Sequence, residues 1–427
     1  MKIRNPRNLV TQVAAKGGII LFLIVALEVV IMISPFAFFF YSVFNPVFNW
    51  LDQYAVTRWL TGFFLPHMIL PPTLFLKSVR VLGSALFILG MAAFVICALQ
   101  VYLGKIFKFG VVTKGLYRYI RHPQYLALGI WGAGMSILWP RFIVLASLSV
   151  MFIIYSFLAR DEEARMRLRF GDAYDQYILK TGRFFPQALE GIFASWERWM
   201  PRPLVRKALT PALIVFAVIG TGFALRAVTL RSLPYESQGN VTLLPILPED
   251  AILSTTILNG VFRGSAAGQT GYLQPGKDYL GYVMIPDYIM QGMIADTGVS
   301  SHLYHHHHTF AMITDWVLHP FAHLRRPPSA QMAKMHGVDP AVARRHHCPL
   351  GINDENLGCN NCPYRRVILV EVDHSSGKHV SGSKLLAFDS VRVPIESIDI
   401  NAHTGEIVNI MKIGKATAWK DVPTPAI

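Results

Sequence analysis

The chain has 427 residues, of which 52% are hydrophobic and only 15% charged, and its mean hydropathy is +0.38. This composition excludes an ordinary soluble protein and is typical of a protein that crosses a membrane several times. The formal net charge of +14 indicates cytoplasmic loops that face anionic lipid, so we interpret it as a membrane signal and exclude nucleic acid as a partner.

The N-terminal region predicts a membrane anchor. Residues 1–16 are basic without any acid, and an apolar run follows over residues 17–44. The run is too long for a signal-peptide core and lacks a small-residue cleavage site, so we predict an uncleaved span. Residues 45–78 are aromatic-rich and broken by Pro66 and Pro71-Pro72. We predict a re-entrant or interfacial hairpin there, which closes an N-terminal region 1–78.

Four further apolar runs predict membrane spans. They are residues 79–103, the shorter pair 124–140 and 141–159, and residues 210–228. The short pair meets at Trp139-Pro140-Arg141, which predicts a tight helical hairpin. With the first run this makes about five spans. The last of them defines a separate segment, residues 201–230.

The basic blocks predict the topology. With five spans, residues 105–121 and 160–207, both rich in Lys and Arg, lie on the same side as the basic N-terminus. This agrees with the positive-inside rule. We therefore expect an integral protein of a bacterial inner membrane, with residues 231–427 on the non-cytoplasmic side.

The C-terminal region predicts an α+β domain outside the membrane. Residues 231–427 are punctuated by Gly, Pro, Asn and Asp, and short alternating runs at Val367–Val372, Lys384–Phe388 and Glu406–Met411 are typical of strands. The predicted fold class is therefore an α-helical multi-span membrane protein with a C-terminal α+β extramembrane domain.

One loop between spans has an unusual chemistry, and a second polar segment follows at a fixed distance. The first contains Gly115, Tyr117 and Arg121-His122-Pro123-Gln124-Tyr125. The second contains Glu162-Glu163, then Phe170-Gly171, Tyr174, Tyr177 and Arg183-Phe184-Phe185-Pro186. Together they resemble the signature of the membrane methyltransferases related to isoprenylcysteine carboxyl methyltransferase and phospholipid N-methyltransferase. The resemblance covers about residues 79–186, which predicts a methyltransferase-like membrane core at 79–200.

The resemblance implies a site for S-adenosylmethionine at the cytoplasmic ends of these helices. The implied cofactor contacts are Val112, Tyr117, Arg121, His122, Pro123, Tyr125 and Glu162. Some relatives carry an arginine three or four residues before the acidic pair, where this chain has Leu158 and Ala159. If the acceptor is an amine, a base is needed, and the candidates are His122 and Glu163.

The residue types suit such a cofactor. Tyrosine rings can face a sulfonium cation, and Arg118 or Arg121 can pair with a carboxylate. Pro123 fits the first turn of a helix, where a missing N–H costs nothing. The alternatives are structural: aromatic and basic residues anchor helices at membrane borders, and Glu163 could pair with Arg167 on a solvated face. Tyr174 and Tyr177 are typical of packing and capping residues.

Histidines and cysteines gather in the C-terminal region. His347, Cys348, Cys359 and Cys362 have the composition of a tetrahedral site for zinc or another transition metal. A disulfide is the main alternative in an oxidising compartment, and it would leave one thiol over. The run His305–His308 could bind copper or zinc, or form a solvated loop.

Two functions follow from the sequence. The first is an integral-membrane, S-adenosylmethionine-dependent methyltransferase that acts on a lipophilic or membrane-embedded acceptor. The second is a catalytically silent, methyltransferase-like accessory subunit of a larger metal or redox complex, with a metal-binding outer domain. The predicted partners are the lipid bilayer, a lipophilic small molecule and, in the second case, other membrane subunits.

Overall fold

The fold is described from a computed structural model, for residues 47–107, 112–191, 203–268, 273–274, 276–286, 294, 363–374, 379–413 and 426–427. Contacts between residues divide the chain into two units. Among the described residues, 75–226 belong to the first unit, and 47–74 together with those from Ala227 onward belong to the second. We describe each unit by itself.

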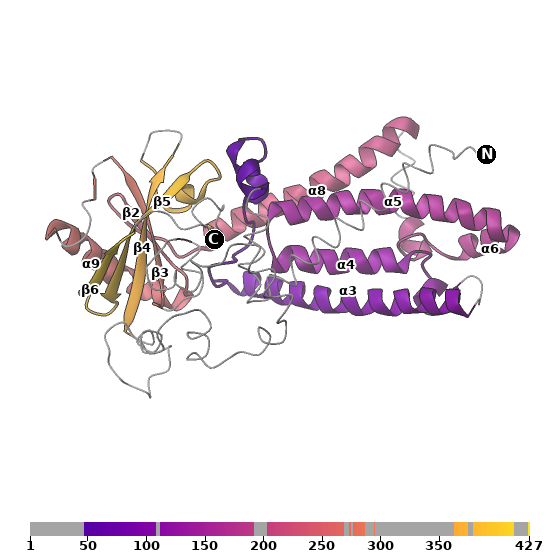
Figure 1. The fold of residues 1–427 in the computed structure, drawn as a ribbon, viewed down its shortest axis with the longest axis horizontal. Helices are drawn as coiled ribbons and strands as arrows, with labels where there is room; N and C mark the ends of the chain where they lie inside the picture. Colours follow the sequence, from indigo (N-terminus) through magenta and orange to yellow (C-terminus); the bar gives the residue numbers. More distant parts are fainter. Residues whose placement is uncertain are drawn as a thin grey trace, which may run out of the picture. The chain divides into compact units, whose positions relative to one another are not determined.

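The first unit is helical, and three of its helices run side by side (Figure 1). They are α3 (Leu74–Ile106), α4 (Pro123–Leu138) and α5 (Phe142–Phe170). The 3₁₀ turn η2 (Gly115–Arg118) precedes α4, and the short helix α6 (Asp172–Lys180) follows α5. Helix α8 (Pro203–Ser232) begins in this unit and ends in the second.

Three described helices, α3, α5 and α8, are long and apolar enough to cross a membrane. This confirms an integral membrane protein. Helix α4 has 16 residues and a length of about 24 Å, short of the roughly 30 Å of a bilayer core. The span predicted at residues 17–44 lies outside the described residues. The predicted count of five spans is therefore not supported.

Helices α3 and α4 approach each other backbone to backbone through glycines. A Cβ on Gly134 would lie 2.3 Å from the backbone nitrogen of Phe87, and one on Gly90 would lie 2.3 Å from that of Trp131. Small residues allow this spacing between membrane helices, where packing has to replace the hydrophobic effect. Only glycine fits at these positions.

Helices α4 and α5 form the predicted hairpin. Helix α4 ends at Leu138 and α5 begins at Phe142. Phe152 of α5 packs where a Cβ of Gly129 would otherwise lie, only 2.0 Å away. Helix α8 joins the same group, because the rings of Phe142 and Phe223 lie 4.6 Å apart.

The second unit contains a six-stranded sheet in the order β1-β2-β3-β4-β5-β6. Neighbouring strands are antiparallel except β2 and β3, which are parallel. The chain crosses between those two through η3 (Pro248–Leu253) and helix α9 (Ser254–Ala266). The strands are β1 (Glu236–Gln238), β2 (Val241–Pro245), β3 (Asp278–Met284), β4 (Tyr364–Asp373), β5 (Val391–Asn401) and β6 (Ile407–Lys412).

Alternating residues of the sheet form a core with α9. Val367 and Leu369 of β4 are buried in one cluster with Ile257 and Val261 of α9. Because every residue of β2 and β3 is buried, the opposite face of these strands is also covered. The expected α+β domain is thus present, and the strand predicted at Val367–Val372 lies within β4.

The prediction for the other two runs is mixed. The run at Glu406–Met411 overlaps β6, whereas Lys384–Phe388 overlaps the 3₁₀ turn η7 (Gly382–Leu386). The strand prediction there is wrong because Leu385 and Leu386 are both fully buried, although a strand turns successive side chains to opposite faces. Gly382, at φ +60°, begins the turn instead.

The segment before α3 packs with the sheet unit. It holds a helical turn at residues 47–53, η1 (Arg58–Thr61) and then irregular chain with buried side chains such as Phe64 and Ile69. The N–H groups of His67 and Met68 donate to the carbonyl oxygen of Ile427 at 3.0 and 3.1 Å. Irregular backbone needs protein partners for its polar groups, and these bonds supply two of them. The predicted re-entrant or interfacial placement of this segment stays a prediction.

Candidate active site

The two polar segments singled out from the sequence meet in the first unit. Pro123 is the first residue of α4, and His122 occupies the N-cap position before it. The acidic pair lies on α5, and α6 follows after Gly171, whose φ of +55° lets the chain turn sharply. The chain then returns through residues 181–186 to the start of α4.

A short backbone pairing joins the segments. The N–H of Arg121 donates to the carbonyl of Gly182 at 2.8 Å, and the N–H of His122 donates to that of Arg183 at 3.0 Å. In the reverse direction, Gly182 N–H donates to Tyr119 at 3.2 Å. These bonds fix the residues before α4 to the residues after α6.

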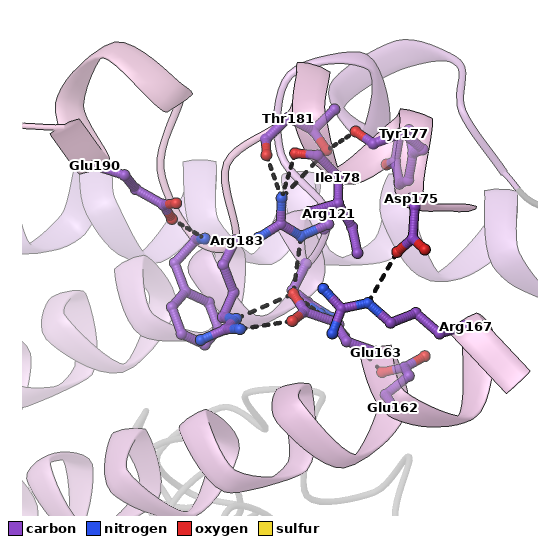
Figure 2. A network of polar contacts seen from close by, with 12 residues as sticks. Arg121, Glu162, Glu163, Arg167, Asp175, Tyr177, Ile178, Thr181, Arg183 and Glu190 are labelled. Atoms are coloured by element: carbon purple, nitrogen blue, oxygen red, sulfur yellow. Dashed lines mark hydrogen bonds and ion pairs between the residues drawn. The ribbon is translucent and has the colours of Figure 1, made fainter. Parts of the chain in front are cut away.

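Glu163 lies at the centre of a charged cluster, shown in Figure 2. Its side chain is 4% exposed. Oε1 accepts from Nε of Arg121 at 2.8 Å and from Nε of Arg183 at 3.0 Å, and Oε2 accepts from Nη2 of Arg183 at 2.6 Å. Nη1 of Arg121 also donates to the carbonyls of Ile178 and Thr181. Charge-assisted bonds of this kind are the strongest hydrogen bonds in proteins.

Three rings form a continuous stack beside this cluster. His122 stacks on Tyr125 with ring centroids 5.4 Å apart, and Tyr125 stacks on Tyr155 of α5 at 4.9 Å. The interplanar angles are 7° and 9°. Offset stacking of this kind stabilises ring orientation beyond simple burial. The stack therefore fixes His122 relative to both α4 and α5.

His122 lies between the two acids. Nδ1 is 3.6 Å from Oε2 of Glu162, and Nε2 is 3.5 Å from Oε1 of Glu163. Tyr125 donates its hydroxyl to Glu162 at 3.4 Å, and the Glu162 side chain is 42% exposed. Within the described chain, Nε2 of His122 is buried without a hydrogen bond. Its nearest acceptor is Oε1 of Glu163 at 3.5 Å, so the imidazole ring lies in contact with both acids.

Gln100 of α3 offers a second polar atom of this kind. Its Oε1 is buried and accepts no hydrogen bond within the described residues. Gly115, at φ +64°, allows η2 to approach closely, since a Cβ there would lie 2.8 Å from Nε2 of Gln100. Tyr117, two residues after Gly115 in η2, donates its hydroxyl to the carbonyl of Cys97 at 3.4 Å. The backbone of η2 thus lies close to Gln100, and Tyr117 of η2 is hydrogen-bonded to the backbone of α3.

The tyrosines of this region remain protonated. Burial raises the pKa of Tyr174 and of Tyr177 to about 12, and that of Tyr117 even further above its usual value. Tyr177 therefore acts as a donor, to the carbonyl of Tyr117 at 2.5 Å. Tyr174 is buried. These contacts agree with packing and capping roles.

Comparison with known proteins shows that this region is similar to one family. Residues 83–168 match the sequence model of the isoprenylcysteine carboxyl methyltransferase family. These residues form an isoprenylcysteine carboxyl methyltransferase-like core. The chain is also 34% identical over 79 residues to the Protein-S-isoprenylcysteine O-methyltransferase of Schizosaccharomyces pombe. That match covers 18% of this chain and 33% of the relative, so the chain spans about one third of the relative's length. No solved structure matches the chain.

The methyltransferase-like core brings together most of the predicted cofactor residues. Tyr125, His122 and Glu162 are in mutual contact, and Pro123 shapes their turn. Val112 lies after α3 in the chain and is half-buried beside the last turn of that helix, where a Cβ on Gly104 would lie 2.9 Å from it. These residues stay predictions as cofactor ligands, but their clustering agrees with that role.

Two residues that were predicted to contact the cofactor, Arg121 and Arg118, have other contacts in the structure. The guanidinium of Arg121 contacts Glu163 and backbone carbonyls. The alternative in which Glu163 pairs with Arg167 on a solvated face is wrong, because Arg167 pairs with Asp175 at 3.0 Å and Glu163 is buried. Arg118 is exposed and lies over the ring of Tyr119.

Three residues of the site were not predicted. Gln100 could have been found as a lone amide in an apolar span, and Tyr155 as an aromatic residue two helical turns before the acidic pair. Arg183 was noted only as part of the signature. Its contact with Glu163 could not be read from a sequence separation of 20 residues.

The described residues contain no group of three or more potential metal ligands. The predicted set His347, Cys348, Cys359 and Cys362 lies outside the described residues, as does the run His305–His308. Zinc or another transition metal at these positions stays a prediction.

Proposed function

We propose that this protein is an integral-membrane, S-adenosylmethionine-dependent methyltransferase that acts on a lipophilic acceptor. The observation that carries the proposal is the meeting of His122 and Tyr125, at the start of α4, with Glu162 of α5. These residues are far apart in sequence and their side chains have the chemistry that the cofactor requires. The family match of residues 83–168 supports the same activity.

The residues present fit the cofactor. S-adenosylmethionine supplies an electrophilic methyl group on a sulfonium when it is bound. Oε1 of Gln100 is a buried acceptor without a hydrogen bond in the described chain. Nε2 of His122 is buried and lies 3.5 Å from Oε1 of Glu163, without hydrogen-bond geometry in the described chain. Glu162 is a partly exposed carboxylate that could accept from an amine or a ribose hydroxyl. Tyr125 offers a ring to a cation.

The two candidate bases differ in their surroundings. Both oxygens of Glu163 accept from arginine side chains, so this carboxylate has little capacity left for a substrate proton. His122 retains a ring nitrogen without a hydrogen bond in the described chain. For an amine acceptor we therefore assign proton removal to His122. For a thiolate or carboxylate acceptor, positioning and exclusion of water are sufficient.

A lipophilic acceptor agrees with the surface of the helices. Apolar and aromatic side chains are exposed on α3 and α5, including Tyr102 at 63% and Phe157 at 57%. In a membrane protein such side chains face lipid. An acceptor dissolved in the bilayer could therefore reach the site along these helices.

We further propose that the C-terminal domain lies on the non-cytoplasmic side of the membrane, as the sequence predicts.

The first test is binding of S-adenosylmethionine to the full-length protein in lipid nanodiscs. We expect Tyr125→Ala to weaken binding about tenfold to hundredfold, since a desolvated cation–π contact and the ring stack are lost. Glu162→Ala should weaken binding as well. The matched control is Tyr119→Ala, because Tyr119 is 57% exposed. Absence of binding by the unchanged protein would contradict the proposal and favour the accessory-subunit alternative.

We expect the replacement of Gln100 by leucine to weaken binding of S-adenosylmethionine without lowering the stability of the protein. The melting temperature should stay the same or rise, because a buried acceptor without a partner in the described chain is removed. The Kd for S-adenosylmethionine should rise about tenfold, since one net hydrogen bond is lost. Thermal unfolding and calorimetric titration measure the two effects. Unchanged affinity would exclude Gln100 from the binding site.

A further inference from the structure

We propose that Glu163 is a positioning residue, which acts through Arg121 and Arg183 to hold His122 and the ring stack in place. The link to methyl transfer rests on the proposed function, whereas the clamp itself is a structural claim. We call the three charged residues Arg121, Glu163 and Arg183 the clamp. Each comes from a different element: the loop before α4, helix α5 and the segment after α6.

The hydrogen bonds of the clamp fix the relative orientation of its three side chains. Arg183 donates to Glu163 with Nε at 3.0 Å and Nη2 at 2.6 Å, a two-point contact that sets the relative orientation of both groups. Arg121 adds a third bond at 2.8 Å. Because Glu163 is 4% exposed and Arg121 is 8% exposed, solvent does little to screen their attraction.

The clamp reinforces the backbone pairing. Arg121 and Arg183 are themselves members of the paired segments, through the bonds from Arg121 N–H to Gly182 and from His122 N–H to Arg183. Without Glu163, two guanidinium groups would lie close together without a shared carboxylate, and like charges repel. The two paired segments would then separate at the residues that precede α4.

His122 would be displaced by such a separation. It follows Arg121 directly, and its N–H is one of the paired groups. Its ring lies on Tyr125 and within 3.5 Å of Glu163. Loss of the clamp therefore disturbs the stack without removing any residue proposed to contact the cofactor.

The charge balance also excludes Glu163 as a proton acceptor. One buried carboxylate serves two guanidinium groups, those of Arg121, whose side chain is 8% exposed, and of Arg183, whose side chain is 31% exposed. Protonation of that carboxylate would leave the buried guanidinium of Arg121 without its counter-charge, which is unfavourable away from water. A positioning role and a role as base thus make different predictions.

The experiment compares Glu163→Gln with Arg183→Lys and with the control Asp175→Asn in full-length protein in nanodiscs. Arg183→Lys keeps the charge but loses the two-point contact, and it guards against failure of the first variant to fold. Asp175→Asn breaks the exposed pair with Arg167, whose side chains are 54% and 55% exposed. Hydrogen exchange by mass spectrometry follows the amides of residues 119–125, and calorimetry follows binding of S-adenosylmethionine.

We expect both clamp variants to accelerate exchange within residues 119–125 about tenfold at Arg121 and His122, since these two amides donate across the local pairing. Affinity for S-adenosylmethionine should fall by a similar factor, while the pH profile of methyl transfer keeps its shape. The control should change neither. Unchanged exchange in Glu163→Gln would overturn the proposal. So would normal exchange and normal affinity in this variant together with the loss of one ionisation from the pH profile of methyl transfer, because that result would assign Glu163 the role of a base. If the unchanged protein binds no S-adenosylmethionine, the proposed function fails, and the exchange data still decide whether the clamp exists.

Discussion

Replacing Gly134 by alanine should destabilise the helical unit by about 3 kcal/mol or more, because the added methyl group overpacks a helix contact with no space. The new Cβ would lie 2.3 Å from the backbone nitrogen of Phe87 and 2.8 Å from the carbonyl oxygen of Gly83. Backbone atoms cannot rotate away as a flexible side chain can, so α3 and α4 would have to separate. Thermal unfolding in detergent, followed by tryptophan fluorescence, measures the effect.

The matched control is Gly220→Ala in α8. No described atom lies within 4 Å of a Cβ at this position, and alanine favours a helix over glycine by up to about 1 kcal/mol. We expect this variant to be neutral or slightly more stable. If Gly134→Ala melted like Gly220→Ala, the close contact of α3 with α4 would be wrong.

Replacing Asp399 by alanine should destabilise the sheet unit by about 3–5 kcal/mol, because one partner of a buried ion pair is removed. Asp399 lies opposite Arg366 on neighbouring strands. Their bonds are 2.7 and 2.9 Å long, and the side chains are 5% and 1% exposed. Asn409 of β6 also donates to Asp399 at 3.3 Å. Hydrogen exchange of β4 and β5 at increasing urea concentrations measures the loss in the intact chain.

Two further variants show whether the buried charge is responsible. The double variant Arg366→Met with Asp399→Leu should recover most of the lost stability, since apolar residues of similar volume often replace a buried ion pair without cost. Glu371→Gln removes the contact between Lys277 and Glu371, which lies on the surface of β3 and β4, and should change exchange little. A double variant as unstable as Asp399→Ala would refute this explanation.

The clamp and the sheet pairs illustrate different uses of buried charge. In the sheet unit each arginine has its own aspartate, Arg365 with Asp250 and Arg366 with Asp399, which satisfies both charges. In the clamp a single carboxylate serves two arginines. The uneven charge makes the clamp sensitive to substitution, and it lies beside the proposed site and not in a domain core.

Several features follow from the sequence because they depend on local pattern and chain length. The apolar run at 79–103 predicts α3, and the hairpin around Trp139-Pro140-Arg141 predicts α4 and α5. In lipid an apolar segment has to form a helix, because a helix satisfies all its backbone hydrogen bonds within the segment. The spacing of the two polar segments across that hairpin predicts that His122 and Glu162 lie at the same end. The β-branched, apolar run at Val367–Val372 predicts β4 from its local composition.

Only the tertiary structure decides which partners a side chain meets. Local pattern allows Glu163 to pair with Arg167 one turn away, yet burial directs it to Arg121 and Arg183, and Arg167 to Asp175. The run at Lys384–Phe388 is predicted as a strand, but both leucines are buried in a 3₁₀ turn. The physical reason is the same in each case: burial and charge compensation depend on neighbours that the fold brings from distant parts of the chain.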